Sequence, residues 1–190
     1  MKTLPKKNKK RVQVYLDHAA TTPIDKRVLK AMMPHLTTQF ANSSALYSLA
    51  NESKQALERA RATVATEIGA QPDTIIFTGS ATESDNLAIL GSARKYKDKG
   101  KHIITSKIEH PAVLEACKQL EKEGFEVTYL PVNKVGIIEL AEVKKALRKD
   151  TILVSIMYAN NEIGSIQPIA DIGRLILKHR KNHESQLPIF

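Results

Sequence analysis

The sequence predicts an α/β protein with a largely parallel sheet flanked by helices. Strand-like apolar runs alternate with helical segments from residue 74 onward, the order that right-handed β-α-β crossovers require. The run TILVSIMY at 151–158 is almost unbroken in its apolar character, as expected of a parallel strand covered on both faces. Segment 111–124 begins with proline and ends with glycine, which is typical of a helix.

The individual elements follow from periodicity and from end signals. Pro23 and Asp25 mark a turn before a short helix, and Gly69 is well placed to end a longer helix. The short helix carries Val28, Leu29, Met32 and Met33. The predicted strands are 14–17, 74–77, 102–105, 125–132, 151–158 and the opening of a strand at 187–190. The other predicted helices are 48–68, 83–97, 111–124, 138–150 and 169–181.

Composition limits the class of protein. A chain of 190 residues with a hydrophobic fraction of 42% can bury one domain core. No apolar run approaches the ~18 residues of a membrane span, and no apolar signal core follows the basic N-terminus. Cys117 is the single cysteine, so no internal disulfide framework is expected and a reducing cytoplasm fits best. We therefore predict a cytoplasmic protein without a membrane segment.

The net charge of +9 is concentrated in two stretches. Residues 1–13 are rich in lysine and arginine and are predicted to form a basic, disordered tail, and KHRK occupies 178–181. Basic runs can bind nucleic acid, but no interleaved aromatic residue or recognition motif accompanies these. A solvated tail is the favoured interpretation, and nucleic-acid binding is the minor one.

Polar residues follow the predicted strands, where ligands bind in a parallel α/β sheet. The clearest case is the Gly79–Thr82 turn, which opens a helix after the strand at 74–77. Glycine allows a close backbone approach, and the unpaired N–H groups of a helix start suit a phosphate. The alternative is a helix cap, with Ser80 or Thr82 as the capping residue and Glu83 nearby. Neither GxxxxGK[ST] nor GxGxxG is present.

Two further strand ends carry candidate site residues, each with an ordinary alternative. His110 precedes a proline-initiated helix and could be a surface or structural histidine. Asn160 and Asn161 follow the apolar strand and could instead form a turn that holds its own backbone. On the residues alone, both alternatives stay open.

A combination of motifs carries a resemblance. YLDHAATTP, FTGSATESDNLAI, HIITSKIEHPAVL, GFEVTYL and TILVSIMYANNEIGSIQPI occur in this order. With this spacing the chain resembles the NifS/IscS-type cysteine desulfurases, class V members of the fold-type I pyridoxal phosphate (PLP) enzymes. SATESDN with NNEIG favours this group over SufS-like desulfurases and class V aminotransferases. The resemblance implies that the sheet belongs to the large domain of the PLP-dependent transferase (aspartate aminotransferase-like) fold.

The same resemblance implies roles for four residues and no metal. The Ala81–Thr82 backbone and the Thr82 hydroxyl would bind the phosphate of PLP. His110 would stack on the pyridine ring and act as the catalytic residue in proton transfer. Asn161 would hydrogen-bond near the ring hydroxyl. These roles suit a cofactor that acts as the electron sink while the protein positions it.

The family's Schiff-base lysine lies in a Ser-x-His-Lys motif after a His-x-Asp-Ala-x-Gln strand, and neither motif occurs in this sequence. We therefore expect residues 14–190 to be the N-terminal portion of the PLP-binding large domain, truncated before that lysine. Cys117 lies on a predicted helix and is expected to be a packed hydrophobic side chain rather than the sulfur acceptor.

The implied function is PLP-dependent conversion of L-cysteine to L-alanine. The sulfur would pass to an enzyme persulfide for iron–sulfur cluster assembly or tRNA thiolation. The implied partners are L-cysteine, a sulfur-acceptor or scaffold protein, and a second copy of the chain or the missing C-terminal half. The chain alone is expected to be inactive. The alternatives are a non-catalytic binding module, a split-enzyme subunit that pairs with a desulfurase, or another class V enzyme such as a selenocysteine lyase or aminotransferase.

Overall fold

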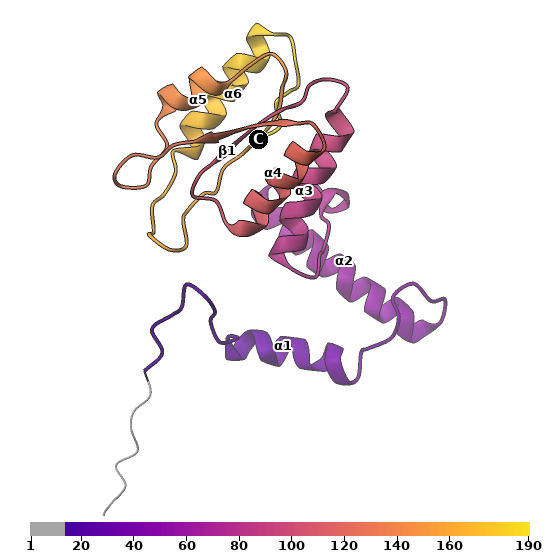
Figure 1. Cartoon of the computed structure of the whole chain (residues 1–190). Coiled ribbons are helices and arrows are strands. Elements are labelled where there is room, and N and C mark those ends of the chain that lie inside the picture. Colours follow the sequence, from indigo (N-terminus) through magenta and orange to yellow (C-terminus); the bar gives the residue numbers. More distant parts are fainter. Residues whose placement is uncertain (1–13) are drawn as a thin grey trace, which may run out of the picture. The chain divides into compact units, whose positions relative to one another are not determined.

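The computed structural model describes residues 14–190 and divides into two units, one ending at Ile76 and one spanning Phe77–Phe190 (Figure 1). The predicted basic tail at 1–13 lies outside the described residues.

The first unit contains two helices and one 3₁₀ turn: α1 (Lys26–Thr37), α2 (Ser48–Ile68) and η1 (Pro72–Thr74). Asp25 caps α1, because its carboxylate accepts a hydrogen bond from the Arg27 backbone N–H at 2.7 Å. α2 ends where Gly69 takes the left-handed conformation, with φ of 66°. Both helices predicted in this part of the sequence are confirmed.

The apolar face of α1 is open to solvent. None of its residues is buried, and the four apolar side chains that the sequence places on it are all exposed. They are Val28, Leu29, Met32 and Met33. Within α2 only Ala50 and Ala65 are buried. The first unit therefore has hardly any core of its own.

Two predicted strands, 14–17 and 74–77, are wrong. Residues 14–17 lead into a turn in which the Ala20 N–H donates to the Asp17 carbonyl at 3.2 Å. Thr74 closes η1, and the Ile75 carbonyl accepts from the Arg61 guanidinium rather than from a strand. A strand needs a neighbour for its backbone groups, and neither segment pairs with one among the described residues.

The second unit is built on a parallel sheet, as predicted. Its strands are β1 (His102–Ser106), β2 (Glu126–Leu130) and β3 (Thr151–Ser155), in the order β2-β1-β3. His102 lies opposite Glu126 on one side and Thr151 on the other. Ile189 forms a parallel bridge with Leu153. The predicted opening of a strand at 187–190 is therefore present as a single bridged residue beside β3.

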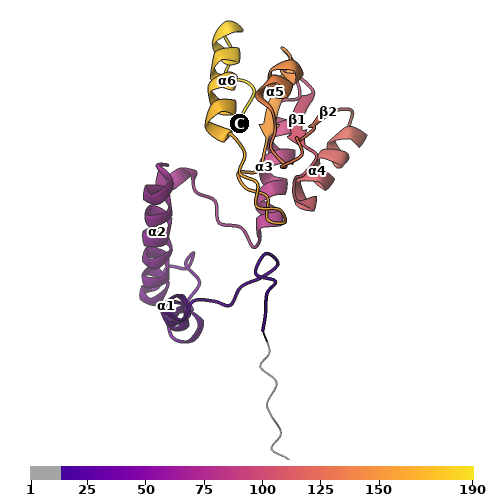
Figure 2. The same ribbon diagram turned by 90° about the vertical axis from the view of Figure 1, so that its left-hand side faces the viewer.

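Helices cover both faces of this sheet (Figure 2). α3 (Ala81–Tyr96) and α4 (Pro111–Lys122) pack around Ile103, whereas α5 (Leu140–Ala146) and α6 (Ile169–Asn182) pack around Ile104. Adjacent residues of one strand point to opposite faces, so β1 contributes to two separate cores. α5 is shorter than the predicted 138–150, and past its end the Arg148 backbone N–H donates to the Thr151 hydroxyl at 2.8 Å.

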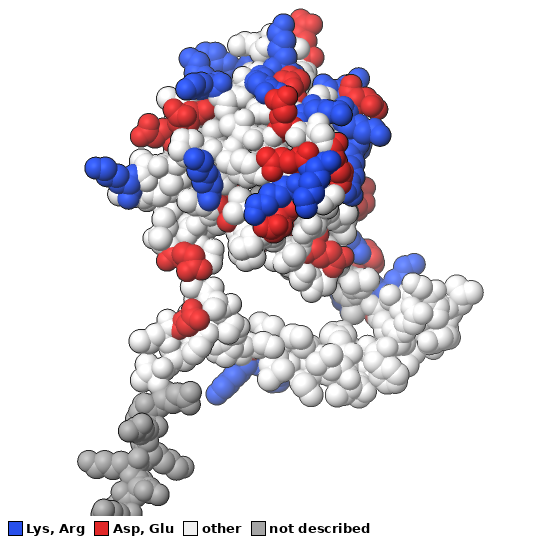
Figure 3. Space-filling model, in the orientation of Figure 1, with Lys and Arg blue, Asp and Glu red and all other residues white. Residues whose placement is uncertain are grey.

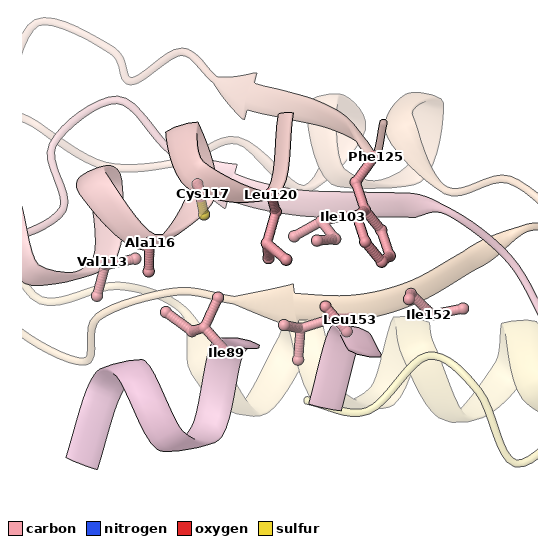
Figure 4. Packing of buried hydrophobic residues seen from close by; sticks show 10 residues of the cluster. Ile89, Ile103, Val113, Ala116, Cys117, Leu120, Phe125, Ile152 and Leu153 are labelled. Atoms are coloured by element: carbon pink, nitrogen blue, oxygen red, sulfur yellow. The ribbon is translucent and has the colours of Figure 1, made fainter. Parts of the chain in front are cut away.

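Cys117 belongs to the core between the sheet and the pair α3 and α4 (Figure 4). Its side chain is fully buried among Ile89, Leu120 and Ile103, and burial raises the pKa of the thiol to about 12. The prediction of a packed hydrophobic side chain is confirmed. Among residues 14–190, no helix combines the length and the apolar character that a membrane crossing requires.

Two glycine-to-alanine substitutions should have opposite effects on stability. A Cβ at Gly100 would overlap the Asp150 backbone carbonyl, so Gly100→Ala should lower the free energy of unfolding by about 1–3 kcal/mol. Gly91 lies inside α3, and a Cβ added there would have no atom near it. Gly91→Ala should therefore raise the free energy of unfolding by about 0.5–1 kcal/mol. Urea unfolding followed by circular dichroism measures both. Equal effects from the two variants would contradict the packing at Gly100.

Candidate functional site

The start of α3 is closed by a cap centred on Ser80. The Ser80 hydroxyl accepts from the Glu83 N–H at 3.1 Å, and the Glu83 carboxylate accepts from the Gly79 N–H at 2.7 Å. This is close to a capping box. Of the two candidate caps in the sequence, Ser80 is therefore the capping residue and Thr82 is not.

The cap leaves a group of donors at the helix start. Among the described residues, no acceptor takes a hydrogen bond from the N–H groups of Ala81 and Thr82 or from the Thr82 hydroxyl. Both residues are exposed. The positive end of the α3 dipole lies at the same place, so this turn can receive an anion while remaining capped.

His110 caps the next helix. Its Nδ1 accepts from the Ala112 backbone N–H at 3.1 Å, and Pro111 is the first residue of α4. The side chain is exposed. Because Nδ1 accepts in this arrangement, Nε2 is the ring nitrogen that carries the proton. The ring is thus fixed at one edge and open on its other side.

Two hydrogen-bonded contacts hold the loop after β1 against the segment after β3. The buried Glu109 carboxylate accepts from the Met157 N–H at 3.0 and 3.1 Å and from the Ser106 hydroxyl at 2.6 Å. The Asn160 side-chain amide donates to the Ile108 carbonyl at 2.9 Å. His110 follows Glu109 and Asn161 follows Asn160, so these contacts place the two candidate residues on adjoining loops.

The two asparagines have different environments. Asn160 is buried, and its side-chain oxygen accepts from the N–H groups of Glu162 and Ile163 at 2.9 and 3.0 Å. It therefore holds its own turn, as the structural alternative predicted. Asn161 is exposed, and its amide contacts the Glu162 carboxylate at 3.2 Å. Asn161 is the one of the pair that faces solvent.

The topology brings the start of α3 to the same edge of the sheet. α3 leads through a short loop into β1 and packs on α4 and β3, so it runs antiparallel to the strands. Its first residues accordingly lie at the carboxyl edge, where the loops of His110 and Asn161 also lie. The charge of Asp85, one turn into α3, acts on Glu109 and helps to raise its pKa, although burial is the largest cause.

Sequence reasoning missed Glu109, Ser106 and His102. Glu109 adjoins a candidate residue, but its partner Met157 lies 48 residues away, and no local pattern reveals that contact. His102 lies at the opposite, amino edge of the sheet. Its ring nitrogens contact the hydroxyls of Thr151 and Thr128, each at 2.8 Å, and burial is the largest cause of its lowered pKa. Within residues 14–190, no group of three or more His, Cys, Asp or Glu side chains could hold a metal ion.

A family model described as aminotransferase class-V matches residues 14–182. The chain belongs to the class-V aminotransferase family. Among solved structures, a NifS-like protein superposes with a TM-score of 0.85 at 42% identity, covering 88% of this chain and 46% of that one. SspA in complex with cysteine superposes with a TM-score of 0.82 at 45% identity, covering 87% of this chain and 48% of that one. The fold prediction is confirmed.

Curated relatives carry the name cysteine desulfurase IscS. The protein from Dictyoglomus turgidum is 55% identical over 163 residues, which are 86% of this chain and 41% of the relative. The protein from Neisseria meningitidis serogroup C is 56% identical over 169 residues, 88% of this chain and 42% of the relative. This chain thus spans less than half the length of these relatives.

Class-V aminotransferases imply PLP, and the residues present fit that cofactor. Three donors without an acceptor among the described residues meet at the α3 start, where a phosphate would bind. An exposed imidazole and an exposed amide lie on two adjoining loops at the same edge. An aromatic ring with a phosphate arm matches this donor set.

The buried Glu109 should make stability depend on pH. Burial raises its folded pKa above the usual 4.5, so the unfolded chain ionises first and the stabilising contribution is lost as pH rises through the folded value. Glu109→Gln removes this titration. The parent's free energy of unfolding, minus that of the variant, should fall as the pH rises above about 4, where the unfolded chain starts to ionise. Glu139→Gln makes the same chemical change at an exposed position, the N-cap of α5, and serves as the control for the substitution itself. A constant difference for Glu109→Gln would contradict the assignment.

Proposed function

We propose that this chain forms the phosphate- and ring-binding part of a cysteine desulfurase. The activity would convert L-cysteine to L-alanine with PLP and pass the sulfur to an enzyme persulfide, for iron–sulfur cluster assembly or tRNA thiolation. The proposal rests on the N–H groups of Ala81 and Thr82 and the Thr82 hydroxyl, which have no acceptor among the described residues. They lie at the same edge of the sheet as His110 and Asn161, whose loops are joined by hydrogen bonds. This arrangement occurs in a chain that is 55–56% identical to proteins named cysteine desulfurase IscS.

The local geometry supports each role that the resemblance implies. The N–H groups of Ala81 and Thr82, with the Thr82 hydroxyl, would bind the phosphate. The His110 ring is flat, exposed and fixed through Nδ1, so it would lie against the pyridine ring and hold a proton at Nε2. The Asn161 amide would donate to the ring hydroxyl. PLP supplies the electron sink when it is bound.

The proposed substrate is L-cysteine. SspA, a structural neighbour at 45% identity, was solved in complex with cysteine. The thiol of Cys117 is buried and its pKa is raised, so it does not suit the role of sulfur acceptor, which requires a thiolate. We infer that three groups come from other polypeptide: the acceptor cysteine, the Schiff-base lysine and the Asp of the family's His-x-Asp-Ala-x-Gln strand. The single cysteine supports a reducing, cytoplasmic location.

An apolar hollow marks where further polypeptide would pack. It has a volume of about 540 Å³ and is lined by residues of α3, of β3 and its following segment, and of the final residues. Ile156, Tyr158, Ile189 and Phe190 are among them. The partner would be the C-terminal half of a desulfurase, a second copy of the chain, or both. A sulfur-acceptor or scaffold protein would bind the completed enzyme.

Removing the Thr82 hydroxyl should weaken cofactor binding. In the chain completed by the C-terminal part of an IscS relative, Thr82→Ala should raise the PLP dissociation constant about 10- to 100-fold, because a hydrogen bond to a charged group is lost. Thr82→Ser keeps the hydroxyl and should stay within about threefold of the parent. Titration by PLP absorbance measures both. If both variants match the parent, Thr82 does not bind the phosphate.

Residues 1–190 alone should not desulfurate cysteine. With PLP, L-cysteine and a reductant, the purified chain should release sulfide and alanine no faster than free PLP, because the sequence lacks the Ser-x-His-Lys lysine. Borohydride reduction should trap no single site-specific adduct. Adding a polypeptide that carries the Schiff-base lysine and the acceptor cysteine should restore turnover. Turnover by the chain alone would place a nucleophile within these 190 residues and overturn the proposed division.

A further inference from the structure

The basic run at 178–181 becomes part of a groove between α5 and α6. One hollow of about 350 Å³ is lined by Lys144 and Leu147 from α5 and its C-terminal cap, and by residues of α6. A second hollow of about 460 Å³ follows around Lys149 and the end of α6. Asn182 lines both hollows, so they adjoin. We call them together the α5–α6 basic groove.

The lysines of this groove lack carboxylate partners. Three lysines that line the groove and two more in the last turns of α5 and α6 are exposed, and among the described residues none of the five forms an ion pair. They are Lys144, Lys145, Lys149, Lys178 and Lys181. Glu184 is the one carboxylate among the described residues that line the two hollows. Figure 3 shows lysine and arginine side chains at the end of the second unit where α5 and α6 lie, with some acidic side chains among them.

Helix dipoles account for only part of this arrangement. Basic side chains in the last turn of a helix are stabilised by its dipole, which covers Lys144 on α5 and Lys181 on α6. Lys149 lies beyond α5 and gains nothing from that effect. Nor does the dipole require that two helices direct lysines to one groove. Excess positive charge in a groove attracts an anionic ligand and raises its rate of association.

The chemistry of the groove indicates carboxylates rather than a nucleic acid. Its lining contains no Tyr or Phe, and its two aromatic rings, those of His179 and His183, lie against each other with centroids 4.3 Å apart. The nearby arginines are already engaged, because Arg148 binds Asp150 and Glu126, and the Arg180 guanidinium donates to the Pro188 carbonyl. Lysine ammonium groups act as point charges without the planar fork of arginine, which suits single carboxylates spaced along a peptide.

We propose that the α5–α6 basic groove docks an acidic segment of a partner protein. α6 runs antiparallel to the strands, so its C-terminal end and the groove lie at the amino edge of the sheet. The candidate PLP site lies at the carboxyl edge. A partner bound in the groove would therefore leave His110 and Asn161 accessible. This inference does not depend on the proposed desulfurase activity.

Charge reversal in the groove should weaken the docking. The probe is a fluorescein-labelled dodecapeptide of alternating Glu and Ser, and its affinity for the full chain is measured by anisotropy in low salt. The Lys144→Glu/Lys178→Glu double variant should bind at least about tenfold more weakly, since both cations line the same hollow. Lys97→Glu/Lys99→Glu makes the same change in net charge at exposed, unpaired lysines outside the groove, and should lose less than about twofold.

Three results would overturn the proposal. The first is an equal loss in both double variants, which would show a general charge effect. The second is tighter binding of a dodecathymidine oligonucleotide than of the acidic peptide, with the same dependence on Lys144 and Lys178. The third is unchanged binding in the neutral Lys144→Gln/Lys178→Gln variant, which also tests the groove if the charge reversal prevents folding. Circular dichroism checks that each variant is folded.

Discussion

The hydrogen bonds accepted by the buried Glu109 carboxylate hold the loop after β1 against the segment after β3, and the candidate site depends on them. A backbone N–H and a hydroxyl satisfy this carboxylate, with no cation among its hydrogen-bond donors. Asn160 reinforces the contact from the other loop by donating to the Ile108 carbonyl. His110 and Asn161 each follow one of these two anchors directly in sequence, so their backbones are fixed while their side chains remain exposed.

Burying a carboxylate without a counterion is unfavourable, and two pKa values near Glu109 reflect this. The pKa of Glu109 is raised, and its charge contributes, after burial, to the raised pKa of Cys117 in the adjoining core. A neutral amide could accept from Met157 with less cost. A buried carboxylate next to a candidate catalytic histidine is typical of a functional site. At such sites the position of a side chain is maintained at a cost in folding stability.

The sequence predicted the local features of this fold better than the non-local ones. Helix ends at Gly69 and Pro111 follow from backbone preferences of single residues, and both are confirmed. The strands at 14–17 and 74–77 are wrong because a strand exists only with a neighbour, and periodicity does not reveal one. The division of roles between Asn160 and Asn161 was equally hidden, because it depends on the Ile108 carbonyl 52 residues from Asn160. The motifs indicated candidate residues, whereas the contacts that hold those residues required the structure.

The two interpretations of the Gly-Ser-Ala-Thr turn, helix cap and phosphate site, turn out to be compatible. The Ser80 hydroxyl accepts from the Glu83 N–H, and the Glu83 carboxylate accepts from the Gly79 N–H. The N–H groups of Ala81 and Thr82 have no acceptor among the described residues and are open to solvent. α4 shows the same division, because His110 caps the helix through Nδ1 and leaves Nε2 open. At both helix starts, one polar group secures the fold and a neighbouring one stays available for a ligand. A cap in the sequence is therefore no evidence against a binding site at the same turn.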